Sequence, residues 1–403
     1  MITVVDKTQC CGCEACACAC PTKCIDLIED NEGFLYPFVR EPQCIECGTC
    51  EKVCPVLNSI PDTPITQHGY IVQSLDQTLL FDSTSGGAFT EIARSVFQEG
   101  GVVFGVALDV AGMPRHSFAV CEDDLAGMRG SKYAQSAIGK SFTQVKEFLD
   151  AGRSVLFSGT PCQVEGLLSF LGEKPSNLLL VDIVCHSVPS PLVWRRYLEM
   201  QREKLKCKVH NIKFRDKRPY GYQYSQMSLY DEFEKRHYCE GVETDPFLRA
   251  FFSEICNRPI CHACPFKKRY RVSDITIWDC WNAGELDSRF DSNVGTSKVL
   301  THTKRGFETV ESISSTSLLA HIEPDALCEG ERELLHSTIP NPKRGQFLFD
   351  CANEKNASIL FGKWFPQTMR TRAEKAVRRL LARTGISFRA KSMLKNVLGK
   401  ARR

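Results

Sequence analysis

The chain lacks the features that would place it in a membrane or in the secretory route. No stretch of its 403 residues approaches the roughly 20 consecutive apolar residues of a membrane-spanning helix. The first residues do not have the charged-then-apolar order of a secretory signal. A large net charge is also missing, since 51 Lys and Arg stand against 48 Asp and Glu, and the composition excludes global disorder. We therefore expect a folded protein of two or three domains.

Cysteine, by contrast, is abundant. The sequence has 22 cysteines, and eleven of them lie between residues 10 and 54. In a long chain without a secretory signal, so many thiols are expected to be metal ligands in the reduced state rather than disulfides. This composition predicts a cytoplasmic protein.

A cysteine motif occurs twice near the start of the chain. The pattern C-x2-C-x2-C-x3-C-P covers residues 10–21 and is repeated at residues 44–55. In such runs three cysteines surround one 4Fe-4S cluster, and the fourth ligates the cluster of the other copy. The two crossed ligand sets are Cys10, Cys13, Cys16 and Cys54, and Cys20, Cys44, Cys47 and Cys50. The alternatives are zinc sites, which usually separate cysteine pairs by a long gap, and a disulfide knot.

The organisation of the chain changes after this segment. Residues 1–57 resemble a bacterial two-cluster 4Fe-4S ferredoxin domain, an α+β fold of βαββαβ order. Residues 58–66 contain two prolines and no apolar periodicity, which indicates a linker. Residues 67–350 alternate strand and helix patterns, which predicts a larger α/β mixed-sheet domain with α+β additions. We expect strands at 69–74, 101–108, 154–158 and 178–184, and helices at 88–98, 142–149, 163–171 and 192–205.

Two polar segments of the larger domain are candidate binding elements. Residues 83–89, Ser-Thr-Ser-Gly-Gly-Ala-Phe, open an expected helix, and free backbone amides at a helix start suit a phosphate or a flavin pyrophosphate. The alternative is a serine cap next to a tight glycine turn. Residues 129–136 form a second polar segment, for which a solvated loop is the alternative.

Four further cysteines are dispersed along this domain. Cys162 and Cys185 each follow an expected strand, so both are expected at one edge of a doubly wound sheet. Cys261 and Cys264 form a C-x2-C pair that would complete a third cluster site there. The alternative is two buried core thiols and a separate zinc-like pair. His186 is a weaker candidate ligand, since a histidine at a strand end is more often only hydrogen-bonded.

Taken together, these strings resemble a known family. The ordered set is STSGGxF (83–89), GSKYxQS (130–136), GTPCQ (159–163), CHxVPS (185–190), FRDK (214–217), CxxCPFK (261–267) and SDITI (273–277). It is similar to the family of coenzyme F420 hydrogenase/dehydrogenase beta subunits, here with a ferredoxin domain in front. The resemblance implies an iron–sulfur flavoprotein with FAD and a 4Fe-4S cluster in the larger domain.

Site residues follow from that resemblance. It makes Cys162, Cys185, Cys261 and Cys264 the ligands of a third 4Fe-4S cluster. The implied flavin contacts are Ser85, Gly86, Gly87, Lys132, Tyr133 and Ser136. Lys132 would lie near the flavin ring, where positive charge stabilises the reduced anion. No catalytic residue is predicted.

One segment departs from the family pattern. The family strand usually ends Gly-Asp-Phe/Tyr-Trp-Gly, whereas residues 278–282 are Trp-Asp-Cys-Trp-Asn. Losing both glycines puts bulk where backbone would approach a cofactor. The leading hypothesis is an oxidoreductase that passes electrons between a flavin-bound hydride donor or acceptor, F420-like or another organic substrate, and 4Fe-4S clusters or a ferredoxin-type partner. The alternative is an electron-relay subunit without its own substrate site, tied to cell-surface polysaccharide biosynthesis in an anaerobic host.

The C-terminal segment is strongly basic. Residues 366–403 contain twelve Lys and Arg and one acidic residue, Glu374. Apolar residues at helical spacing among the arginines predict a basic amphipathic helix. A solvated helix is the simplest interpretation, and weak contact with an anionic membrane at its inner face is an alternative. A nucleic-acid partner is not expected, because no base-reading module accompanies the charge.

Overall fold

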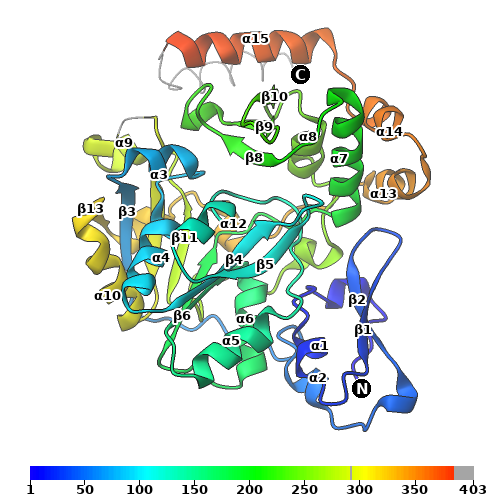
Figure 1. Cartoon of the computed structure of the whole chain (residues 1–403), viewed down its shortest axis with the longest axis vertical. Helices are drawn as coiled ribbons and strands as arrows, with labels where there is room; N and C mark the ends of the chain where they lie inside the picture. Colours follow the sequence, from blue (N-terminus) through cyan, green and yellow to red (C-terminus); the bar gives the residue numbers. More distant parts are fainter. Residues whose placement is uncertain (291–292, 385–403) are drawn as a thin grey trace.

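The structure, a computed structural model, describes residues 1–290 and 293–384 (Figure 1). In this view the N-terminal segment lies at the lower right and the largest sheet at the left and centre. A smaller sheet and the C-terminal helices lie above them. None of the described helices combines the length and the apolar character that a bilayer span requires.

The N-terminal segment repeats its geometry as well as its sequence. It contains α1 (Ala15–Ala19), β1 (Ile25–Glu29), β2 (Leu35–Val39) and α2 (Thr49–Lys52). The two strands form an antiparallel hairpin in which Leu27 lies opposite Pro37. Each helix begins after a left-handed residue at the same motif position, Glu14 at φ 63° and Gly48 at φ 71°. Of the four strands of a βαββαβ fold, the described residues contain these two, so the ferredoxin-like assignment stays a prediction.

The largest sheet has eight strands. They are β3 (His68–Ser74), β4 (Val102–Leu108), β5 (Pro114–Ala119), β6 (Val155–Gly159), β7 (Leu178–Ile183), β11 (Ile275–Asp279), β12 (Ser297–Thr301) and β13 (Ser317–Ile322). Their order is β13-β3-β12-β11-β7-β6-β4-β5. The central strands β11, β7, β6 and β4 run parallel, and the flanking pairs are antiparallel. This is the mixed sheet expected of the larger domain.

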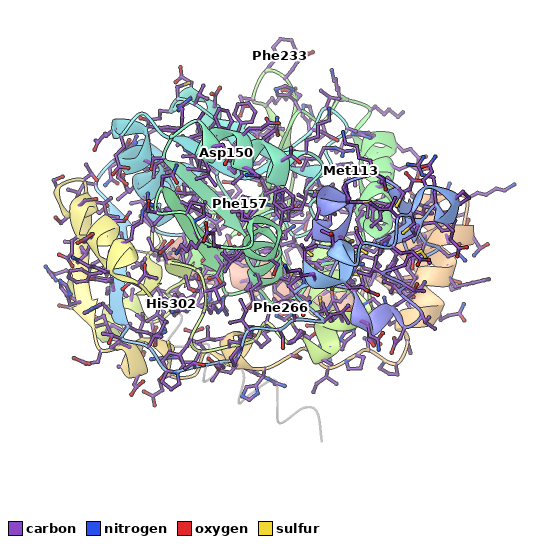
Figure 2. The ribbon with its side chains drawn as sticks, turned by 90° about the horizontal axis from the view of Figure 1, so that it is seen from below. Met113, Asp150, Phe157, Phe233, Phe266 and His302 are labelled. Carbon is purple, nitrogen blue, oxygen red and sulfur yellow. The ribbon has the colours of Figure 1, made fainter. Side chains whose placement is uncertain are left out.

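Helices cover both faces of this sheet. Side chains alternate along each central strand, so that Val155 and Phe157 lie in one core and Leu156 in the other. The first core includes α5 (Ser141–Asp150) and α6 (Pro161–Leu171), and the second α4 (Ala88–Gln98) and α10 (Lys304–Ser312). Figure 2 shows Phe157 near the middle of the molecule, whereas Phe233 projects at its edge.

A second, smaller sheet lies beside the large one. Its strands β8 (Asn211–Asp216), β9 (Gln226–Tyr230) and β10 (Arg236–Glu240) are antiparallel. Its core includes Trp194, Phe214 and Phe247. The surrounding helices are α7 (Pro191–Leu205), α8 (Pro246–Phe252), α13 (Arg344–Asn353) and α14 (Ala357–Trp364). The remaining short helices are α3 (Gln77–Asp82), α9 (Ala283–Leu286), α11 (Pro324–Cys328) and α12 (Arg332–Leu335).

The basic C-terminal segment begins as the expected helix. This helix, α15 (Met369–Thr384), lies over the smaller sheet at the top of Figure 1. Lys375 forms an ion pair with Glu240, and Arg379 donates a hydrogen bond to the Cys239 carbonyl at 2.9 Å. Part of its charge is therefore directed at the protein. The rest of the predicted basic segment, residues 385–403, lies outside the described residues.

Candidate functional site

A cavity of about 1000 Å³ opens at the carboxyl ends of the parallel strands. Its lining includes the residues that follow β6 and β7 and the end of β11. This is the edge at which open α/β sheets bind ligands. The volume is at the upper end of that found for small-molecule and cofactor sites.

The hydroxyl-rich loop before α4 forms one wall of the cavity. Ser85 and Gly87 line it, together with the first residues of the helix. Gly86 is not part of the lining, and it packs against the backbone of the sheet instead. A Cβ at this position would lie 2.2 Å from the Val72 carbonyl oxygen and 2.5 Å from the Ser297 nitrogen. Its small size lets the loop pack against the sheet, and the loop then directs the start of α4 at the cavity.

The polar segment 129–136 forms a second wall. Lys132 is partly buried, and its Nζ donates one hydrogen bond, at 2.9 Å, to the Arg129 carbonyl. Burial lowers its pKa to about 7. Tyr133 stacks on Phe251 with ring centroids 4.8 Å apart. Ser136 Oγ lies 3.2 Å from His116 Nδ1 and lines the same cavity.

The departing segment 278–282 faces the cavity from β11. Asp279 forms an ion pair with Arg215 and accepts a hydrogen bond from Tyr222 at 2.9 Å. Trp281, half-exposed, stacks on Tyr222 at 4.6 Å, and the Arg215 guanidinium lies 4.7 Å from the Trp281 ring. Sequence reasoning misses Arg215 and Tyr222 as site residues. The FRDK string that contains Arg215 is the available signal.

Four cavity-lining residues have buried polar atoms with no hydrogen-bond partner among the described residues. They are Arg129 Nε, Ser187 Oγ, Arg215 Nη2 and Trp278 Nε1. Buried polar groups are nearly always paired in folded proteins, so such atoms indicate a missing polar ligand. The cavity therefore fits a large molecule with several hydrogen-bonding groups, and a flavin dinucleotide meets that description.

The four dispersed cysteines converge beside this cavity. Cys162 begins α6, Cys185 follows β7, and both line the cavity, while Cys261 and Cys264 lie at the short 3-10 helix η5 (Pro259–Ala263). Burial raises the pKa of the Cys261 thiol, and the thiolate charges of the other three cysteines raise it further. The sequence-predicted set is thus mutually close.

Positive charge surrounds this thiol set. Burial raises the pKa of Cys185 to about 12, and the Lys267 and Arg271 charges oppose that rise. Lys267 Nζ donates to backbone carbonyls, including that of Glu333 at 2.6 Å. Among the described residues, no three Cys, His, Asp or Glu side chains are arranged to hold a single metal ion. Four thiols facing cations are the donor chemistry of an anionic cubane cluster.

The first crossed set of the N-terminal motif surrounds a small internal cavity. All four cysteines line it, with apolar neighbours such as Leu27 and Val56. Burial raises the pKa of Cys16 to about 12, and the charges of Cys10 and Cys54 add to the effect. Cys54 of the second repeat therefore lies with cysteines of the first, as crossed ligation requires. These residues fit a 4Fe-4S cluster.

The second crossed set lies nearer the surface. Cys50 is buried, Cys20 and Cys44 are partly buried, and Cys47 is exposed. Hydrogen bonds with Thr49 lower the pKa of Cys47, and the charge of the Cys20 thiolate acts in the opposite direction. Cys20 of the first repeat thus lies near the second repeat, which again matches the crossed arrangement.

Cys11 connects the first N-terminal set to the set in the larger domain. From the sequence alone, small filler is the simplest interpretation of this residue. The Cys11 thiol is buried and interacts with both Cys13 and Cys162. A Cβ on Gly166 of α6 would lie 2.8 Å from the Cys13 Cβ, so this glycine permits the close approach. The two thiol sets are therefore neighbours.

His186 is already paired within the protein. Its Nε2 lies 2.5 Å from Glu254 Oε1 and its Nδ1 lies 3.7 Å from Glu333 Oε1. Burial alone would lower the pKa of His186, but the two carboxylates outweigh it and raise the pKa to about 9. This matches the hydrogen-bonded interpretation of a histidine at a strand end.

The larger domain also resembles a known protein family. The family model described as the C terminus of the coenzyme F420 hydrogenase/dehydrogenase beta subunit matches residues 152–326. That range contains all four dispersed cysteines. Over this range the chain is therefore similar to the beta subunits of coenzyme F420 hydrogenases and dehydrogenases. Members of this family are oxidoreductase subunits.

Two individual relatives each match only part of the chain. The F subunit of the F(420)H(2) dehydrogenase of Methanosarcina mazei is 23% identical over 196 residues, 45% of this chain and 54% of that protein. The chain thus spans about half the length of this relative. The VorC subunit of the ketoisovalerate oxidoreductase of Methanothermobacter marburgensis is 34% identical over 59 residues, 14% of this chain and 75% of that protein.

A solved structure also resembles the chain. It is the xenon-derivatized F420-reducing NiFe hydrogenase complex from Methanosarcina barkeri, at 16% identity and a TM-score of 0.45. The match covers 73% of this chain and 94% of the other.

Proposed function

We propose that this protein is an iron–sulfur flavoprotein oxidoreductase with three 4Fe-4S clusters and FAD. The observation that carries the proposal is the continuous cavity of about 1000 Å³ that extends from the start of α4 to Cys162 and Cys185. A flavin held there would lie against a cluster ligand set. When bound, FAD exchanges a hydride with a substrate and single electrons with iron–sulfur centres.

Different residues of the cavity would contact different parts of the bound molecules. The start of α4, with Ser85 and Gly87, would hold the pyrophosphate through backbone amides. Lys132 would supply positive charge beside the ring, and it has no carboxylate partner among the described residues to neutralise it. Trp281 offers a flat exposed ring at which a planar substrate would stack. An F420-like deazaflavin or another organic hydride donor or acceptor has that shape.

The arrangement of thiol sets supports an order of electron transfer. The cavity meets the Cys162 set, which adjoins the Cys10 set through Cys11. The Cys44 set lies farther along, with Cys47 exposed. We infer that electrons enter or leave through this last set, to a ferredoxin-type partner or another redox subunit. The relatives named above are themselves subunits, which supports such a partner.

Anaerobic purification of the full chain tests the proposal. We expect about twelve iron atoms per chain, bound FAD, and an absorbance band near roughly 400 nm. Reduction would then be screened with NADH, reduced F420 and reduced ferredoxin. A folded protein with four or fewer iron atoms would refute the three-cluster proposal, and a zinc-loaded colourless protein would replace it with a structural role.

A relay role without a substrate site is the second candidate. It is favoured by Trp278 and Asn282, which stand where the family has glycines and which line the cavity. Full iron content with no flavin, even after incubation with FAD, would support the relay. Bound FAD that is reduced by a hydride donor would exclude it.

A further inference from the structure

Arg258 is a buried cation at the junction of the N-terminal segment and the larger domain. Its side chain is 0% exposed and is among the largest fully buried side chains. It immediately precedes η5, which contains Cys261. Its Nε donates to the Cys10 carbonyl at 2.7 Å, and its Nη2 donates to the Leu35 carbonyl at 2.9 Å. The guanidinium also lies over the ring of Tyr36, 4.4 Å from its centroid.

This charge has no carboxylate partner in the described part of the chain. Among the described residues, no Asp or Glu oxygen lies within ion-pair distance of Arg258. The Arg258 charge acts on the pKa of Glu14, but the Glu14 carboxylate accepts its hydrogen bonds from the backbone N–H groups of Ile138 and Gly139. An isolated buried charge is costly, so buried cations are normally paired. The guanidinium instead has sulfur neighbours.

These sulfur atoms come from both thiol sets. Arg258 Nη2 lies 3.4 Å from Cys10 Sγ. The thiolates of Cys10, Cys11 and Cys261 act electrostatically on Arg258, and Arg258 in turn acts on Cys162. One guanidinium thus lies between two proposed cluster sites and donates a hydrogen bond to a proposed ligand sulfur.

We propose that Arg258 is a positioning residue that supplies the counter-charge shared by these two cluster sites and raises their reduction potentials. The inference depends on the proposed function, because it needs both clusters. Reduction adds one electron, makes no bond and moves no proton here, so the reduced site is more negative by one charge. A fixed cation and a hydrogen bond to a ligand sulfur stabilise that state.

A purely structural role predicts something different, and Arg344 provides the matched control. Arg344 crosses the same junction, with Nη2 2.6 Å from Glu32 Oε2 and Nε donating to the Asn257 carbonyl at 2.7 Å. Its charge is balanced by that carboxylate. Arg344→Gln therefore loosens the junction without removing the cation beside Cys10.

The experiment compares Arg258→Gln, Arg258→Lys and Arg344→Gln in the full chain, purified anaerobically. Iron content is measured first, and each cluster midpoint is then determined by a redox titration followed by electron paramagnetic resonance. In Arg258→Gln we expect the reduction equilibrium constant of at least one cluster to fall tenfold or more, which is about 59 mV for one electron. Arg258→Lys, which keeps the charge but loses the fork of hydrogen bonds, should fall between wild type and Arg258→Gln. Arg344→Gln should leave the constants unchanged within about threefold.

The outcomes distinguish failure of the proposed function from failure of the proposed role of Arg258. Four or fewer iron atoms in the unmodified protein would refute the proposed function itself. Full iron with unchanged midpoints in Arg258→Gln, or with equal shifts in Arg258→Gln and Arg344→Gln, would refute the role of Arg258. If Arg258→Gln does not assemble clusters, Arg258→Lys decides: a lowered midpoint supports the role, and an unchanged one overturns it.

Discussion

Gly166 offers a direct test of the junction between α6 and the N-terminal segment. In Gly166→Ala, the new methyl group would lie 2.8 Å from the Cys13 Cβ and 3.0 Å from its Sγ. These distances are below normal contact, so Cys13 or the helix must move. Overpacking of this kind typically costs about 1–3 kcal/mol. Because Gly166 lies inside a helix, the substitution also gains about 0.5–1 kcal/mol of helix propensity.

Gly362 provides a control that separates the cost of the steric clash from the gain in helix propensity. It lies inside α14, is exposed, and a Cβ there would meet nothing within 4 Å. Gly362→Ala has the same propensity gain without the clash. The difference in free energy of unfolding between the two variants should therefore be about 1–3 kcal/mol, with Gly166→Ala the less stable.

Urea denaturation of both full-length variants, without oxygen, measures this difference. Iron content gives a second readout, since a displaced Cys13 would weaken the first N-terminal cluster and remove up to about four iron atoms of twelve. Equal stability of Gly166→Ala and Gly362→Ala, with unchanged iron, would show that Cys13 does not pack against α6.

Three further predictions address the cavity and the tail. Burial lowers the pKa of Lys132 from 10.5 to about 7, so between pH 7 and pH 10.5 the unfolded chain binds more protons than the folded chain. The free energy of unfolding of the flavin-free protein should therefore rise with pH in this range, and Lys132→Met should flatten the rise. Asp279→Asn leaves the Arg215 charge unpaired and should lower the free energy of unfolding, measured by urea denaturation, by about 2–3 kcal/mol, which is less than the loss expected on breaking a fully buried pair. As a control, Glu308→Gln removes one partner of an exposed ion pair and should lower it by under about 0.5 kcal/mol. If the basic tail contacts lipid, removal of residues 385–403 should weaken cosedimentation with anionic vesicles by on the order of 1 kcal/mol per Lys or Arg, and unchanged binding would exclude that contact.

Local patterns in the chain are reliable guides to its elements. The helices expected at 88–98 and 192–205 are α4 and α7 within one residue at each end. Strands at 69–74 and 178–184 agree equally well, because burial on alternate or both faces leaves a periodic trace in the sequence. The cysteine spacing likewise predicts which thiols lie together, since short loops leave few ways to aim three sulfur atoms at one point.

Other features have no local signature. Arg258 is separated from Cys10 by 248 residues, and Arg215 from Asp279 by 64. Gly86 looks like a ligand-binding glycine in the sequence, although it packs against backbone that comes from β3 and the start of β12. Such contacts depend on how distant elements stack, which periodicity does not encode.

The sequence by itself predicted most of the helices and strands of the larger domain, the two crossed cysteine sets and the family resemblance. Each depends on spacing within about fifty residues or on strings that occur in order. Only the tertiary structure decided that the larger domain's thiols adjoin the Cys10 set through Cys11, that α15 covers the smaller sheet, and that a guanidinium without a carboxylate partner among the described residues lies between two thiol sets. The physical reason is that burial and charge compensation are properties of the packed interior, where residues far apart in the chain become neighbours.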